Sequence, residues 1–305
     1  MGSHAQLAHV VVIGAAGAVG RLFCGVLADA GSALTLVDVA PEPAAELRSL
    51  GAYRALDARR SSAELDAALA SADCALLALP EAVALDALPH VLAALPAGAL
   101  LADTLSVKTP FVQAALARAA PVELCSLNPM FAPSLGFAGR AVLALEPRPG
   151  PRSGALLALL RTRAHVVTVP DAETHDRATA GLQVATHAGV LAFGLALAQL
   201  GGDLEALLPA APPPFLAQLA LLARIADGAP ATYADIQRAN PFAPAARAAL
   251  ADALGRLDAA ARDADPHALE ALIATATAPL GEHRAALAAQ AAALLACVEP
   301  PDLHS

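Results

Sequence analysis

The chain contains no tryptophan, and aromatic side chains make up only 3% of its 305 residues. Basic residues are also scarce: 19 lysines and arginines stand against 28 aspartates and glutamates, which gives a formal net charge of −9. A nucleic acid or an anionic membrane surface is held by a basic protein surface, so this balance argues against both kinds of partner. It leaves room for a small anionic ligand in a local basic pocket.

The spacing patterns of metal sites and disulfides are missing as well. No two of the four cysteines form a Cys-x-x-Cys pair, and each lies in an apolar run. We interpret them as reduced thiols and predict no metal site. No signal peptide is apparent, and the longest apolar helical stretch, residues 184–200, is short for a bilayer span and contains polar side chains. We therefore expect a soluble, cytoplasmic protein. The cysteines are Cys24, Cys74, Cys125 and Cys297.

What the chain has in abundance is apolar sequence, with 57% hydrophobic and 15% charged residues, enough for a large core. In the first half, short apolar runs alternate with alanine-rich amphipathic segments, a pattern that predicts βαβ units and a mostly parallel sheet. The expected strands are 9–13, 33–37, 74–79, 99–102, 122–126, 141–145 and 165–169. The expected helices are 21–30, 42–50, 63–70, 82–95 with a break near Pro89, and 154–163.

The strand signal stops after Pro170. Four helical segments follow, at 173–200, 215–226, 244–263 and 266–298. With the first four residues set aside, the sequence predicts an α/β domain over residues 5–170 and an all-helical domain over residues 171–305. Residues 147–152, which are rich in proline, are expected to form a turn or linker.

A glycine turn follows the first expected strand, with Gly14, Gly17 and Gly20 in the spacing Gly-x-x-Gly-x-x-Gly. Glycines here permit a tight turn, close approach of a pyrophosphate and close helix packing, and the helix N-terminus attracts phosphate. The turn predicts a Rossmann-type dinucleotide-binding domain, although Ala15 stands where the strict motif has glycine. The expected cofactor contacts at this turn and at the end of strand 74–79 are Gly14, Ala16, Gly17, Ala18, Val19, Gly20, Leu79 and Pro80.

Asp38 completes this fingerprint at the end of the second strand, 24 residues after Gly14. A carboxylate at this place accepts hydrogen bonds from the adenosine ribose and repels the 2′-phosphate of NADP. No arginine or lysine lies in residues 39–46 to bind that phosphate. The sequence therefore predicts NAD as the cofactor.

Two polar segments follow later strands of the sheet, where ligands of open parallel sheets bind. They are Asp103-x-x-Ser106-x-Lys108 and Asn128-Pro-Met-Phe131. At these residues the sequence resembles the prephenate dehydrogenase family, whose loops read Asp-x-x-Ser-x-Lys and His-Pro-Met-Phe-Gly. The resemblance continues, in the same order, in Glu173-Thr-His175-Asp176, Gln183-x-x-x-His187, Leu219-x-x-x-x-Arg224 and Tyr233-Ala-Asp-Ile236.

The resemblance implies a Rossmann domain followed by a helical dimerisation domain, a homodimer, and a cyclohexadienyl dicarboxylate as substrate. The reaction implied is oxidative decarboxylation with NAD. By resemblance, Arg224 pairs with a substrate carboxylate, for which its guanidinium is well shaped. Gln183 and Lys108 join it as expected substrate ligands, and Ser106, Asn128 and His187 are the expected catalytic residues. His175 and Asp176 are interpreted first as helix-start and packing residues and second as site residues.

Asn128 departs from the family pattern, because the family has a catalytic histidine at this position. An asparagine accepts hydrogen bonds but cannot act as a general base, whose loss typically costs roughly 10²- to 10⁴-fold in rate. A substrate with an amine on ring carbon 4 would need no base, since the nitrogen lone pair alone drives hydride loss. The residue therefore favours 4-amino-4-deoxyprephenate, with 4-aminophenylpyruvate as product and antibiotic biosynthesis as context.

Other interpretations remain open at this point. In the first of these, the protein is a prephenate or arogenate dehydrogenase in which another residue, such as His187, acts as the base. Alternatively, the chain is a non-catalytic NAD-binding homologue that has kept the fold. An imine-reductase-like protein shares the two-domain plan, but the segment 128–131 does not suit it.

Overall fold

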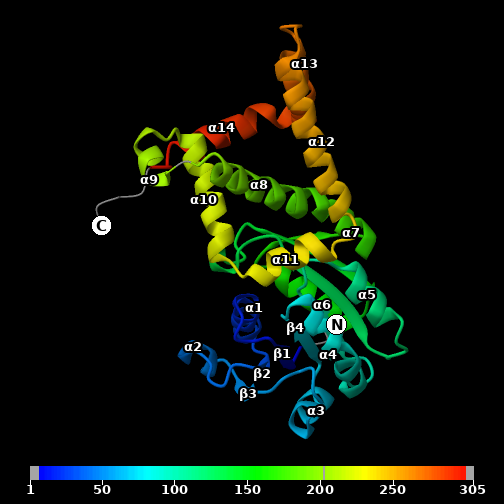
Figure 1. Cartoon of the computed structure of the whole chain (residues 1–305). Helices are drawn as coiled ribbons and strands as arrows, with labels where there is room; N and C mark the ends of the chain where they lie inside the picture. The colour runs from blue at the N-terminus through cyan, green and yellow to red at the C-terminus, as the bar shows by residue number, and fades with distance from the viewer. Residues whose placement is uncertain (1–6, 202, 300–305) are drawn as a thin grey trace. The chain divides into compact units, whose positions relative to one another are not determined.

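The structure, a computed structural model, describes residues 7–201 and 203–299. The chain divides into two compact units. Figure 1 shows the whole chain, coloured from blue at the N-terminus to red at the C-terminus. Among the described residues, the first unit comprises 7–178 and 238–241, and the second comprises 179–201, 203–237 and 242–299. Helix α7 (Ala172–Thr179) thus lies almost entirely in the first unit.

An eight-stranded sheet forms the centre of the first unit, in the order β3-β2-β1-β4-β5-β6-β7-β8. Every neighbouring pair is parallel except β6 and β7. From β1 the chain moves outward first to β2 and β3 and then, on the other side, from β4 to β8, and the order 3-2-1-4-5-6 within it is that of a Rossmann-type sheet. The strands are β1 (His9–Ile13), β2 (Ala33–Asp38), β3 (Ala52–Ala55), β4 (Cys74–Leu77), β5 (Leu100–Asp103), β6 (Glu123–Pro129), β7 (Ala141–Arg148) and β8 (His165–Thr168).

Helices cover both faces of the sheet, and the side-chain alternation of β1 shows how. Val10 and Val12 are buried in the core of one face, together with α1 and α6, whereas Val11 and Ile13 are buried in the core of the other, with α3, α4 and α5. Successive side chains of a strand point to opposite faces, so a continuous apolar run is what a doubly covered strand needs. The covering helices are α1 (Ala18–Asp29), α3 (Ala63–Ala70), α4 (Glu81–Ala94), α5 (Thr109–Leu116) and α6 (Pro151–Arg161), with the short α2 (Ala45–Arg48) beyond β2.

Several local expectations are wrong. β7 continues to Arg148 and α6 begins at Pro151, so the expected linker at 147–152 is mostly strand and helix. Pro89 lies inside α4 without ending it. β6 runs three residues further than expected, which places Asn128 within the strand rather than in a loop after it. β6 and β7 pair in antiparallel fashion because the connection of residues 130–140, which contains only the short turn η1 (Pro133–Leu135), carries no crossover helix.

The second unit is helical throughout its described part, as expected. A π-helical segment, η2 (Ala180–Ala185), joins α7 to α8, and the expected helix at 266–298 is broken at Gly281, where φ is 49°. Buried apolar residues are few, and the small core comprises Val184, Ile236 and Ala243. The remaining elements are α8 (Thr186–Gln199), α9 (Leu204–Leu207), η3 (Leu208–Ala210), α10 (Pro213–Asp227), α11 (Pro230–Ala239), α12 (Ala243–Arg262), α13 (Ala268–Thr277), η4 (Ala278–His283) and α14 (Arg284–Leu295).

Candidate active site

The glycine turn after β1 requires two of its three glycines for steric reasons. Gly14 has φ of 86°, and a Cβ at this position would lie 2.2 Å from the carbonyl oxygen of Ala78. A Cβ at Gly20 would lie 2.0 Å from the carbonyl oxygen of Gly14, which leaves no room for any side chain between α1 and β1. Ala15 is fully buried and fits where the strict motif has glycine. The relaxed spacing thus still produces a tight strand–turn–helix junction.

The N-terminus of α1 is open to an anion. Gly17 caps the helix without a side-chain hydrogen bond, and the first turn contains no acidic residue. The first N–H groups of a helix have no acceptor within the helix and attract negative charge. The predicted contacts Ala18 and Val19 lie in this first turn, and Leu79 and Pro80 follow the neighbouring strand β4. The turn therefore fits the pyrophosphate of a dinucleotide.

Asp38, at the end of β2, is held beside this turn by two backbone hydrogen bonds. Its Oδ2 accepts from the N–H of Ala16 at 2.9 Å and its Oδ1 from the N–H of Ala40 at 3.0 Å. The carboxylate is only partly buried, so its oxygens can still accept a hydroxyl hydrogen bond from a ligand. These bonds fix the carboxylate at the place where the ribose of a dinucleotide lies in Rossmann domains.

A buried ionic cluster joins the ends of β5 and β6. Lys108 is completely buried, and its Nζ donates to Asp103 Oδ1 at 2.7 Å and to the carbonyl oxygen of Leu127 at 2.6 Å. Ser126 Oγ donates to the other oxygen of Asp103. Each partner of this buried ion pair makes a further hydrogen bond, Lys108 to a carbonyl oxygen and Asp103 to a hydroxyl group, which offsets part of the cost of burying the charges. The ammonium of Lys108 therefore holds the 103–108 loop against β6.

Asn128 is the next polar residue of β6 beyond this cluster, and only 1% of its surface is exposed. Its Nδ2 lies 3.1 Å from Nε2 of His175 and 3.4 Å from the carbonyl oxygen of Ser106. Ser106 itself is partly exposed. The two predicted catalytic residues of this unit, Asn128 and Ser106, are thus brought into direct contact.

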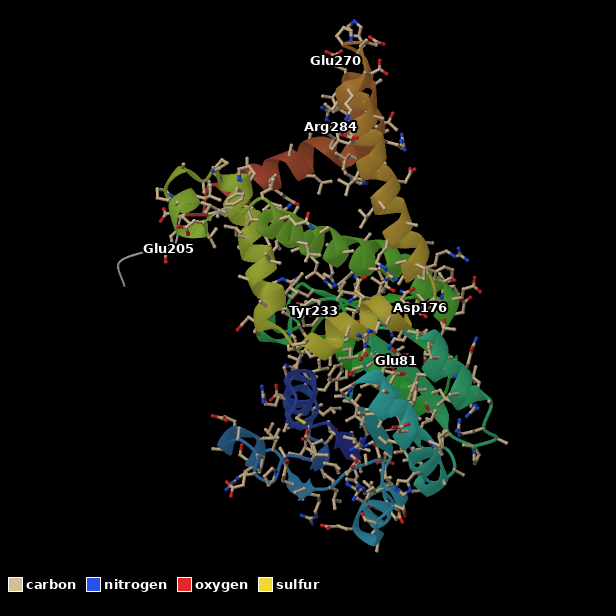
Figure 2. All side chains as sticks on the ribbon, viewed as in Figure 1. Glu81, Asp176, Glu205, Tyr233, Glu270 and Arg284 are labelled. Atoms are coloured by element: carbon tan, nitrogen blue, oxygen red, sulfur yellow. The ribbon has the colours of Figure 1, made fainter. Side chains whose placement is uncertain are left out.

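His175 and Asp176, both from α7, complete the arrangement, and Figure 2 labels Asp176 on the ribbon. Both are fully buried, and His175 Nδ1 lies 2.8 Å from Asp176 Oδ1. Asp176 also accepts from the backbone N–H groups of Lys108 and Thr109, each at 2.8 Å. The pair thereby connects α7 to the start of α5 and to Asn128.

The ionisation of this pair follows from its surroundings. Burial opposes ionisation of Asp176, but the hydrogen bonds from His175 and Thr109 outweigh burial and hold the pKa of the carboxyl below its ordinary value. Burial is also the largest influence on His175, and it holds the pKa of the imidazole below its ordinary value despite the bond to Asp176. Near neutral pH the pair is therefore a carboxylate and a neutral imidazole.

The predicted site residues of the second unit are Gln183, His187 and Arg224. His187 packs edge-on against Tyr233, with ring centroids 5.0 Å apart, and its buried Nδ1 has no hydrogen-bond partner among the described residues. Burial, assisted by the positive charge of Arg224, holds the pKa of His187 below its ordinary value. Arg224 lies in the last turn of α10 and is exposed. Gln183 lies in the π-helical segment, which alters the helical phase between it and His187.

Known proteins were compared with the chain in sequence and in structure. No family model matches the chain. In sequence it is 50% identical, over 279 residues, to a 4-amino-4-deoxyprephenate dehydrogenase of Streptomyces pristinaespiralis, a match that covers 91% of this chain and 93% of the relative. The chain belongs to the prephenate dehydrogenase family. A more distant relative, the T-protein of Enterobacter agglomerans, is 27% identical over 76% of this chain and 56% of its own length.

Solved structures of the prephenate dehydrogenase family share the fold. The prephenate dehydrogenase of Aquifex aeolicus, crystallised with hydroxyphenyl propionate and NAD+, superimposes with a TM-score of 0.72 at 17% identity, over 91% of this chain and 99% of that one. The arogenate dehydrogenase of Synechocystis gives a TM-score of 0.66 at 16% identity, over 90% of this chain and 99% of that one. The predicted fold class is therefore confirmed.

The structure also adds contacts of His175 and Asp176, whose role in the site the sequence interpretation placed second. His175 and Asp176 were interpreted first as helix-start and packing residues and only second as site residues, and they contact Asn128 and the backbone N–H groups of residues 108 and 109. The available signal was the run Glu173-Thr-His175-Asp176-Arg177, in which four of five residues are ionisable, at the start of the helical half of the chain. A substrate contact of Lys108 stays a prediction, and the buried contacts of its ammonium favour a structural role instead.

Proposed function

We propose that this member of the prephenate dehydrogenase family oxidatively decarboxylates 4-amino-4-deoxyprephenate to 4-aminophenylpyruvate, with NAD as the hydride acceptor. The observation that carries the proposal is Asn128. It occupies the position of the family histidine, at the end of β6 and in contact with Ser106 and His175. The 50% identity to a 4-amino-4-deoxyprephenate dehydrogenase supports the same substrate.

The chemistry explains why an asparagine suffices. Ring carbon 4 of the substrate loses a hydride, and the lone pair of its amine stabilises the ring as an iminium. The ring carboxylate then leaves as CO2, and its bonding electrons return to the ring to give a neutral aniline. No proton is released, and an iminium is a weak acid that needs no base. With a hydroxyl in place of the amine the corresponding cation is a protonated ketone, a far stronger acid, so a general base lowers its barrier.

The site residues of this chain bind and orient the substrate. Asn128 accepts a hydrogen bond from the amine through its amide oxygen and so orients the group. Ser106, whose carbonyl oxygen accepts from Asn128 Nδ2, offers its hydroxyl as a second proposed contact. Arg224 binds a substrate carboxylate as a charge-assisted pair, with Gln183 and His187 as further substrate contacts.

The glycine turn and Asp38 fit an NAD cofactor. A Cβ would fill the turn at Gly14 and Gly20, and the N-terminus of α1 carries no competing acidic side chain. In this assignment the first turn of α1 binds the pyrophosphate and Asp38 accepts hydrogen bonds from the adenosine ribose. When bound, NAD supplies the acceptor for the hydride.

Replacing Asp38 with alanine tests the cofactor assignment. Hydrogen bonds to a charged group contribute about 1.5–3 kcal/mol, so we expect D38A to weaken NAD binding by roughly ten- to a hundredfold while NADP binding weakens less or improves. Calorimetric titration with each cofactor measures both. D29A, which removes an exposed carboxylate at the end of α1, is the matched control. Equal loss for both cofactors would instead indicate a collapsed turn, because Asp38 also accepts from Ala16.

The substrate is tested by mixing purified protein and NAD with 4-amino-4-deoxyprephenate, prephenate or arogenate and following NADH absorbance. We expect the amino substrate to have the highest kcat/KM. Faster turnover of prephenate or arogenate would overturn the proposal in favour of tyrosine biosynthesis. NAD binding without turnover of any of the three would indicate a non-catalytic homologue.

The helical unit supports a homodimer in the cytoplasm as part of the same proposal. By length and composition, residues Ala172–Gln199 form a helix long and apolar enough to cross a membrane, and only 17% of its most apolar window is buried within the chain. Its first turns, however, contain the fully buried pair His175 and Asp176, which is hydrogen-bonded inside the first unit. An exposed apolar face on an otherwise soluble chain marks an interaction surface, and the resemblance to a dimeric family makes a second copy the occupant we propose.

Sedimentation velocity tests this state. We expect a dimer for the natural chain and a monomer for Leu195→Glu, because Leu195 is 68% exposed on α8 and a buried carboxylate would oppose association. Leu116→Glu, at a 46% exposed leucine of α5 in the first unit, is expected to leave the dimer intact. A monomeric natural chain would contradict the assignment.

A further inference from the structure

Three buried side chains form a hydrogen-bonded row that ends at the proposed substrate contact. Asp176 Oδ1 lies 2.8 Å from His175 Nδ1, and His175 Nε2 lies 3.1 Å from Asn128 Nδ2. We propose that the His175–Asp176 pair is a positioning device that fixes the amide orientation of Asn128, so that the amide oxygen rather than the nitrogen faces the substrate amine. This inference rests on the proposed function for the identity of the substrate.

The direction of each bond in the row follows from Asp176. Its carboxylate accepts from the backbone N–H groups of Lys108 and Thr109, and an ionised carboxylate has no hydrogen to donate. The contact to His175 Nδ1 therefore requires the proton to sit on Nδ1. A neutral imidazole carries one N–H, so Nε2 of His175 is an acceptor.

Two acceptors then determine how the amide of Asn128 is turned. His175 Nε2 and the carbonyl oxygen of Ser106 both lie next to the same terminal atom of Asn128, at 3.1 Å and 3.4 Å. Only the amide nitrogen has hydrogens for both, because the amide oxygen would face two lone pairs. The nitrogen therefore points toward His175, and the oxygen is directed to the other side of the amide.

This orientation matters for the rate, because the amine lone pair must flow into the ring as the hydride leaves. An amide oxygen that accepts from an amine N–H leaves that lone pair available and raises its electron density. A flipped amide would donate an N–H to the lone pair and oppose its delocalisation. The pair His175–Asp176 is thus expected to affect kcat for the amino substrate, with little effect on KM for NAD.

The tautomer is tested without any substrate. Full-length protein labelled with nitrogen-15 in histidine gives ring nitrogen shifts that distinguish an Nδ1–H from an Nε2–H tautomer. We expect the His175 signals to show Nδ1–H at neutral pH, with assignment by their loss in His175→Gln and their retention in His165→Gln, a substitution at an exposed histidine of β8. An Nε2–H tautomer or an imidazolium would overturn the inference, whatever the substrate is.

Activity provides the second test. His175→Gln keeps an acceptor oxygen near the position of Nε2, whereas His175→Leu has none. We expect kcat for 4-amino-4-deoxyprephenate to fall roughly tenfold or more in His175→Leu and to be largely retained in His175→Gln, with KM for NAD unchanged in both. An equal fall in both variants, or no fall in folded His175→Leu, would overturn the inference. Failure of the natural chain to turn over the amino substrate would instead overturn the proposed function and leave the tautomer result standing.

Discussion

Asn128→His is expected to convert the protein into a prephenate dehydrogenase, with kcat/KM for prephenate rising by roughly 10²-fold or more. The imidazole supplies the general base that prephenate oxidation requires and that the natural chain does not have at position 128. The surroundings of position 128 suit it, because His175 Nε2 is an acceptor 3.1 Å from the present side chain. An imidazole there donates one N–H to His175 and presents its other nitrogen to the substrate. NADH formation from each substrate is the measurement.

The pH dependence of this variant provides a separate signature. The base is the neutral imidazole, so kcat/KM for prephenate should rise with pH through the pKa of the new histidine and level off above it. Free histidine has a pKa of about 6.5, and burial is expected to move this rise to lower pH. The natural chain has no titrating group at position 128, so its reaction with the amino substrate should lack this rise. Any loss of activity at acid pH should instead follow protonation of His175, whose pKa lies below its ordinary value because of burial.

A matched control is Asn128→Ala, which has neither acceptor nor base and should lose activity with both substrates. The prediction is contradicted if Asn128→His binds NAD normally, remains folded and still oxidises prephenate no faster than the natural chain. Combining Asn128→His with His175→Leu should cancel much of the gain, since the new imidazole would lose the acceptor that orients it.

Lys108→Met is expected to lower the free energy of unfolding by about 3–5 kcal/mol. Lys108 is the only lysine in the sequence, and it is completely buried. Its removal would leave the carboxylate of Asp103, only 1% exposed, without its countercharge, and the carbonyl oxygen of Leu127 without a donor. Urea unfolding followed by circular dichroism measures the loss. In the natural chain an amine-reactive probe tests the burial itself, because the Lys108 ammonium should react only when the protein opens.

The double variant Asp103→Asn with Lys108→Met is the control for charge. If the cost of Lys108→Met is mainly an uncompensated buried charge, neutralising Asp103 should recover a substantial part of the lost stability. If Lys108→Met instead unfolds like the natural chain and shows only a raised KM for the cyclohexadienyl substrate, Lys108 is a substrate ligand and the structural interpretation is wrong.

Much of the Rossmann unit was predictable because its strands are buried on both faces. Continuous apolar runs such as His9–Ile13 admit few other structures, and Ala63–Ala70 forms the helix that the sequence predicts. β3 (Ala52–Ala55) was not predicted, because an edge strand with mostly exposed side chains carries no apolar run. α5 was not predicted either. Pro110 was an available signal for its start, because proline is common in the first turn of a helix.

The errors have physical reasons as well. Pro89 lies inside α4 without breaking it, because the helix is packed against the sheet through Leu88 and Val91, and tertiary packing outweighs the lost backbone hydrogen bond. Residues 147–152 resemble a linker in composition, but the proline at 151 begins α6, whose first turn is capped by Ser153 and Glu123. A local pattern cannot show that a proline-rich segment has such partners.

The sequence by itself determined the Rossmann fold, the glycine turn with Asp38, and the residue that departs from the family pattern, Asn128. These features are local, because each depends on the type of residue at a given position in one strand or turn. Only the tertiary structure decided what surrounds Asn128, because His175 and Asp176 lie 47 residues or more along the chain from it and reach it through the packing of α7. The same holds for Lys108. Its ammonium contacts Asp103 on β5 and Leu127 on β6, and only these contacts indicate its structural role. Burial forces each of these groups to find a partner, and which partner it finds depends on the fold.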